Sequence, residues 1–97
     1  MKIYKDRNLT DEVTTLDLGI LPAGERFDYT FYVFNNSEAT LRDMEFKVDH
    51  PEVMIMDYPE ALAPQGIDKL VIRWIPSVTL KEGLKVELKI IGKELYG

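Results

Sequence analysis

The sequence predicts an all-β protein: an antiparallel two-sheet sandwich of about seven strands with an N-terminal arm. Apolar and polar residues alternate over several short segments, such as 27–33 and 84–90, and a period of two is typical of strands. Turn residues separate these segments at near-regular spacing, which favours a sandwich or a barrel. Five prolines interrupt the chain before an apolar stripe of helical period can develop. The 97 residues are enough for one domain with its own core.

Residues 1–12 are expected to form an arm, and residues 13–97 the sandwich domain. The large apolar side chains of the arm are Ile3, Tyr4 and Leu9, and they stand among charged residues. Fixing a backbone costs about 1–2 kcal/mol per residue, so a segment this polar needs something to hold it. The arm either adds a strand to its own sandwich or pairs with the sheet of a neighbouring protein. We favour the partner contact, with Ile3 and Tyr4 as anchors.

Six further segments have the alternation of a strand. Pro22 and Gly24 mark the turn between the first two, because proline fixes φ and glycine permits positive φ. Leu62 is expected to plug one end of the core, and the last segment is expected to be one continuous strand. The predicted strands span residues 13–21, 26–34, 43–49, 53–56, 67–75 and 84–91.

One face of each predicted strand supplies the core. The first strand places Leu16, Leu18 and Ile20 on the same face, and the sole tryptophan, Trp74, lies on the inward face of its strand. The residues predicted to share one core are Leu18, Phe31, Phe46, Leu70, Ile72, Trp74, Val86 and Leu88.

Four short motifs follow one another along nearly the whole chain. The first strand holds Leu16-Asp17-Leu18-Gly19, and a turn with Gly24 follows it. The second strand ends in Asn35-Asn36-Ser37 before Leu41, and a later strand ends in Trp74-Ile75-Pro76. In this order the motifs resemble the immunoglobulin-like sandwiches of the major sperm protein and Hydin-type (ASH) superfamily. The resemblance implies an immunoglobulin-like fold and a module that docks, scaffolds or polymerises proteins, and it transfers no ligand site.

Charge and composition exclude several functional classes. The net charge of −5, from 12 basic and 17 acidic residues, disfavours binding to nucleic acid or to an anionic membrane. The absence of cysteine excludes a disulfide framework and a thiolate metal site. No segment reaches the roughly 20 apolar residues of a membrane span, and the first residues lack the apolar stretch of a signal peptide. We therefore expect a chain that is not secreted by a signal peptide.

No set of residues announces a reaction. His50 is the only histidine, and the two serines, Ser37 and Ser77, stand in turn contexts where a hydroxyl usually bonds the local backbone. A cation site is an alternative interpretation of the acidic residues near His50, but their spacing matches no calcium loop. We expect no enzymatic activity, cofactor, metal or small-molecule substrate. The residues of that alternative cation site are Asp43, Glu45, Asp49, His50, Asp57 and Glu60.

Tyr32 and Phe34 fall on the outer face of the second strand, opposite the inward Phe31 and Val33. Two aromatic side chains on an outer face either form a contact patch or are covered by the arm or a loop. We favour the intramolecular cover and keep both residues as candidates for a partner contact.

These observations predict a non-enzymatic module that binds other proteins. The specific expectation is an accessory, decoration-type virion protein of a tailed bacteriophage, located in the virion and assembled in the host cytoplasm. Its partners would be capsid or shell subunits, or copies of itself. The alternative is a cytoplasmic adaptor or filament-forming module of the major sperm protein or ASH type. The candidate contact residues are Ile3, Tyr4, Leu9, Tyr32 and Phe34.

Overall fold

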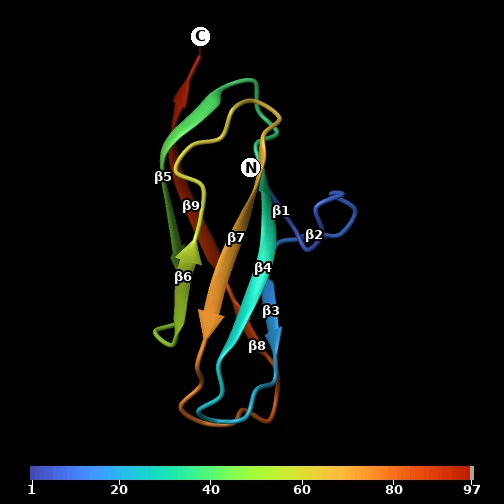
Figure 1. The fold of residues 1–97 in the computed structure, drawn as a ribbon, viewed down its shortest axis with the longest axis vertical. Helices are drawn as coiled ribbons and strands as arrows, with labels where there is room; N and C mark the ends of the chain where they lie inside the picture. The colour runs from blue at the N-terminus through green and yellow to red at the C-terminus, as the bar shows by residue number, and fades with distance from the viewer. Residues whose placement is uncertain (97) are drawn as a thin grey trace.

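The computed structural model describes residues 1–96 as an elongated β-structure that measures 48 × 25 × 16 Å. All strand pairs are antiparallel, and no helix occurs within these residues. The predicted all-β antiparallel sandwich is confirmed, in an open form (Figure 1). The strands are β1 (Lys2–Tyr4), β2 (Glu12–Val13), β3 (Leu16–Gly19), β4 (Phe27–Phe34), β5 (Thr40–Val48), β6 (Val53–Asp57), β7 (Ile67–Trp74), β8 (Leu84–Val86) and β9 (Leu88–Leu95).

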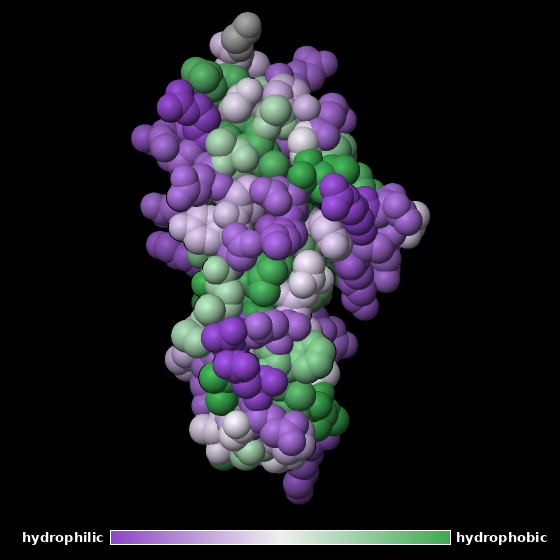
Figure 2. Space-filling view, viewed as in Figure 1, coloured by the Kyte–Doolittle hydropathy of each residue, from purple (hydrophilic) through white to green (hydrophobic). Residues whose placement is uncertain are grey.

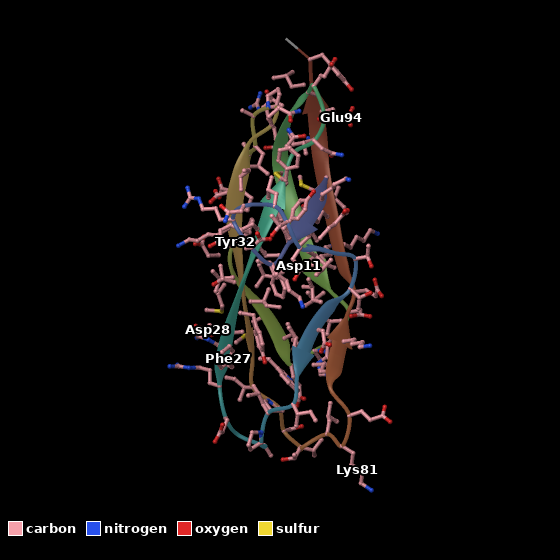
Figure 3. The ribbon with its side chains drawn as sticks, turned by 90° about the vertical axis from the view of Figure 1, so that its right-hand side faces the viewer. Asp11, Phe27, Asp28, Tyr32, Lys81 and Glu94 are labelled. Carbon is pink, nitrogen blue, oxygen red and sulfur yellow. The ribbon has the colours of Figure 1, made fainter. Side chains whose placement is uncertain are left out.

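Two layers form the sandwich. One layer is a five-stranded sheet in the order β2-β1-β4-β7-β6. Strands β4 and β7 form its centre and pair over their full lengths, from Phe27 opposite Trp74 to Phe34 opposite Ile67. The other layer consists of two strand pairs, β3–β8 and β5–β9. In Figure 1 strands β4 and β7 lie in front of β9, and Figure 3 shows the same two layers from the side.

The predicted last strand, 84–91, is two strands that divide at Glu87. Strand β8 pairs with β3, whereas β9 pairs with β5 and continues to Leu95. At the division, the backbone N–H of Glu87 donates a hydrogen bond of 2.9 Å to the Asp49 carboxylate. A side chain therefore satisfies the amide at the point where the segment changes its partner.

The predicted first strand, 13–21, is also divided, into β2 and β3. The register of β3 with β8 shifts between Asp17 and Gly19, where Gly19 has a φ of +70° and its N–H donates to the Asp17 carboxylate. Such a bulge breaks the alternation of side chains. The prediction that Ile20 lies on the inward face is therefore wrong, and its side chain is 56% exposed.

The strand predicted at residues 43–49 begins earlier in the structure, at Thr40, and contains a bulge. Its register with β9 shifts between Arg42 and Glu45, and Asp43 has a φ of +51°. An extra residue in one strand of a pair lets pairing resume beyond the irregularity. The bulge interrupts the alternation of apolar and polar residues, so the sequence pattern did not reveal that the strand includes residues 40–42.

Side chains from both layers fill one core. Six of the eight predicted core residues belong to it, while Phe46 and Leu88 are only partly buried against it. Both lie at its margin, Leu88 beside an open groove and Phe46 against the exposed ring of Tyr58. Leu62 is 5% exposed and plugs the core as predicted. The buried apolar cluster comprises Ile3, Leu16, Leu18, Phe31, Val33, Met44, Val53, Leu62, Leu70, Ile72, Trp74, Leu84 and Val86.

Replacement of Trp74 by alanine should lower the free energy of unfolding by about 3–5 kcal/mol, because it removes a buried indole and leaves a cavity. Within residues 1–96 the Trp74 Nε1 has no hydrogen-bond partner, so the loss is one of packing. Chemical denaturation measures it. Phe27→Ala is the matched control, since Phe27 stands opposite Trp74 in the sheet but is 51% exposed. Small and equal effects of the two changes would contradict the core position of Trp74.

Candidate functional site

The N-terminal arm is a strand of its own sandwich in this structure. Strand β1 pairs with β4, with Ile3 opposite Val33 and Tyr4 opposite Tyr32, and it also pairs with β2. Ile3 is 9% exposed and Val33 is fully buried. Of the two alternatives for the arm, the structure contains the intramolecular pairing, and Ile3 is a core side chain. Ile3 could contact a partner only if β1 left β4.

The segment between β1 and β2 is an ordered loop around the Asp6 carboxylate. This carboxylate accepts hydrogen bonds from the backbone N–H groups of Thr10 and Asp11 and from the Thr10 hydroxyl. The Lys5 N–H donates to the Asp11 carbonyl at 2.9 Å and closes the loop. Leu9 is half-buried within it, at a φ of +58°. The loop projects to the right in Figure 1, and Figure 2 shows that its surface is hydrophilic.

The loop should respond to acid, because the hydrogen bond from the Thr10 hydroxyl lowers the pKa of Asp6 below its usual 3.8. A lowered pKa means that the ionised form stabilises the folded loop. This stabilisation is present above pH 3.8 and is lost as the pH falls through the lower folded value. The NMR amide signals of Thr10 and Asp11 should shift with a midpoint below 3.8, and Asp6→Asn should abolish that titration. A midpoint at or above 3.8 would contradict the carboxylate's role.

Tyr4, Tyr32 and Phe34 share the outer face of the five-stranded sheet, and all three are half-buried. The rings of Tyr4 and Phe34 meet edge to face, with centroids 6.5 Å apart. Tyr4, a residue of the arm, thus covers part of Phe34, one of the two aromatic side chains for which intramolecular cover was the favoured interpretation.

Charged pairs surround these aromatic side chains. Lys69 stands opposite Tyr32 and forms an ion pair of 3.6 Å with Asp57. Arg73 forms a two-bond ion pair with Asp28, at 2.8 and 3.1 Å, which lowers the pKa of that carboxyl. In Figure 2 hydrophilic and apolar atoms intermingle over this face. It therefore offers no continuous apolar surface to a partner.

Asn35 is a buried polar residue whose role the sequence did not reveal. It follows β4 directly, is 0% exposed, and its amide nitrogen donates to the carbonyls of Ala39, Leu62 and Ala63 at 2.8–3.1 Å. Its Oδ1 accepts the Ser37 N–H and the Ser37 hydroxyl. The Asn35-Asn36-Ser37 turn is thus the centre of a buried network that ties the end of β4 to the segment before β7. Its only signal in the sequence is an amide directly after an apolar strand.

Replacement of Asn35 by aspartate should destabilise the fold strongly, because a buried carboxylate would face three carbonyls that now accept the Asn35 amide. Each carbonyl keeps one other donor, so the cost comes from burying an ionised group against oxygen atoms. Burial raises the pKa of a carboxyl, so the folded variant binds a proton and its loss of stability should be smaller at pH 4 than at pH 7. Denaturation at the two pH values measures this.

Asn36→Asp is the matched control for this change. Asn36 is exposed, and its Oδ1 only accepts a hydrogen bond from the Met1 ammonium, which a carboxylate would also accept. A similar loss of stability in both variants would contradict the role given to the Asn35 network.

The residues considered for catalysis or metal binding lie apart. His50 is in the turn between β5 and β6, where its Nδ1 accepts the Glu52 N–H at 3.1 Å. Ser37 uses its hydroxyl within the Asn35 network, in a different turn. Across residues 1–96, no group of three or more His, Asp or Glu side chains is close enough to hold a metal ion. The six candidate ligands named above are therefore not brought together.

The most distinctive surface is one side of β9. Strand β9 pairs with β5 along one edge, and within the part of the chain that the structure describes no strand pairs with its other edge. A groove of about 330 Å³ opens there, between β9 and the β1–β2 pair. No β5 residue lines it. The apolar part of the lining comes from Met1, Ile3, Val13, Leu88 and Ile90.

No protein-family model, curated protein or solved structure matches the chain. The described part of the chain also has no helix that is long and apolar enough to cross a membrane.

Proposed function

We propose that this chain is a non-enzymatic module that binds other proteins through the open side of its sandwich. The observation that supports this proposal is the edge of β9 that no strand of residues 1–96 pairs with, beside a groove whose lining is partly apolar. An exposed strand edge presents a row of N–H and C=O groups that another chain can pair with. The outer face of the five-stranded sheet, where charged and apolar side chains intermingle, offers no comparable surface.

Comparison with the other edges singles out β9. Strand β2 has two residues, while β3 and β6 are short and each shows a register shift in its pairing. The outer edge of β5 is covered by residues 60–62, since Leu41 and Leu62 exchange both backbone hydrogen bonds and the Met44 N–H donates to Glu60. Short strands, bulges and covering loops are the usual protection of sheet edges. Strand β9 has eight residues, and the bulge in its pairing lies on β5 rather than on β9. Its groove side has no strand partner within residues 1–96, and the charges of Lys89 and Lys93 are the protection that this strand carries.

For the biological setting, we propose an accessory virion protein of the decoration type, which binds capsid or shell subunits. A small sandwich with a strand edge available for pairing suits a repetitive assembly, and this support is an analogy of architecture. The alternative is a cytoplasmic adaptor or filament-forming module, and the order of motifs shared with the major sperm protein and ASH superfamily favours it.

Fractionation of the native source by size, followed by mass spectrometry, tests this proposal. The chain should sediment with larger assemblies at a constant ratio to one or more major proteins. Capsid or shell proteins in those fractions would support the virion role, and cytoskeletal or adaptor partners would support the alternative. Recovery of the chain only in the fractions that contain free monomers would contradict the proposal.

A further inference from the structure

We propose that the groove beside β9 receives an extended segment of a different protein in which apolar side chains alternate with acidic ones. This inference rests on the proposed function and names the chemistry of the partner at the same surface. The partner segment would add a strand to β9 and place its apolar side chains between the two layers.

The position of β3 shows where such a strand would lie. Strand β3 pairs with β8, and Thr15, just before β3, still reaches Glu87 through a hydrogen bond of 3.2 Å. Further back, Val13 has crossed to the other layer, where it pairs with Ile3. The strand position that β3 fills beside β8 therefore has no strand in it beside β9. Figure 3 looks onto this side, with β4 on the left, β9 on the right and β1 between them.

Burial changes at the point where β3 begins, opposite Val86. Val86, on β8, is 1% exposed, whereas Leu88 and Ile90, on the inward face of β9, are only half-buried. These two side chains line the groove together with Ile3 and Val13, and its polar part comes from Thr14 and the ion-paired Lys2 and Glu12. The groove volume of about 330 Å³ would accommodate roughly two apolar side chains of a partner, since a cavity of about 150 Å³ holds one benzene molecule. The inward residues of an added strand should therefore be apolar.

The outward side of the same strands is mostly cationic, with Glu45 opposite Ile91 between two pairs of basic residues. Across the β5–β9 pair, Lys47 stands opposite Lys89, and Arg42 stands opposite Lys93. Like charges in directly opposite positions destabilise a sheet. Lys93 has an exposed ion pair of 3.7 Å with Asp43, and no carboxylate of residues 1–96 lies within 4.0 Å of the charged groups of the other three. In a chain of net charge −5, this cationic row is a local feature that acidic side chains of a partner would neutralise.

The same charges disfavour a second copy of the chain as the occupant. Two β9 strands paired edge to edge would add the Lys89 and Lys93 of one copy to those of the other. Lysines on an edge strand are a common protection against self-pairing. A strand with outward glutamates or aspartates would attract Lys89 and Lys93, whereas a second β9 would repel them.

The probe is a seven-residue peptide of alternating valine and glutamate with blocked ends, titrated into the full-length ¹⁵N-labelled protein and followed by NMR. The control peptide has lysine in place of each glutamate. The glutamate peptide should shift β9 amide signals in a saturable manner, and the lysine peptide should not. Lys89→Glu/Lys93→Glu should weaken binding of the glutamate peptide at least tenfold. Lys85→Glu is the matched control, because Lys85 lies on β8, whose edge β3 already fills, and it should bind as the native protein does.

Four results would overturn the inference: no saturable binding, equal binding of both peptides, unchanged binding by the double variant, or a β9-paired dimer in sedimentation. The comparison of the two peptides needs no variant, so a variant that failed to fold would not leave the question undecided. If the peptide fails to bind but the chain still sediments with larger assemblies, this inference is wrong and the proposed function stands. If both experiments fail, the proposed function is wrong as well.

Discussion

Strands β3 and β5 depend on one segment, residues 84–95, because within the described residues neither has another strand partner. The second layer of the sandwich therefore rests on how this segment divides its hydrogen bonds. The division falls at Glu87, where the Asp49 carboxylate holds the amide while pairing passes from β3 to β5. One strand line thus supports two neighbours, each over part of its length. The position beside β9 that β3 does not reach is a direct consequence of this arrangement.

The buried Asn35 network explains why the other edge of the same layer is closed. Asn35 holds the carbonyls of Leu62 and Ala63, and its own N–H donates to Gly66. These bonds fix the segment before β7, so that Leu62 enters the core and exchanges backbone hydrogen bonds with Leu41 of β5. The outer edge of β5 is covered as a result. The two edges of the β5–β9 pair therefore differ: one is sealed from within the chain, and the other remains open.

The sequence predicts the centre of the fold better than its edges. Alternation places β4 and β7 within one residue of their observed ends and puts Leu70, Ile72 and Trp74 inward. A period of two reports the face of a side chain but not which strand pairs with which, since pairing depends on residues far apart in the chain. For this reason the bulges at Asp43 and Gly19 and the division at Glu87 were not predicted. The pairing of Ile3 with Val33 was not predicted for the same reason, because the sequence of the arm does not reveal it.

Amide hydrogen exchange, measured residue by residue on the dilute monomer, tests most directly whether the β9 edge is open. Successive amides of an edge strand point alternately to its partner and away from it. We expect alternate amides of β9 to exchange quickly, like exposed amides, while those directed at β5 and those between β4 and β7 are protected. Uniform protection along β9, equal to that of β4, would show that its second edge is already paired and would contradict this account.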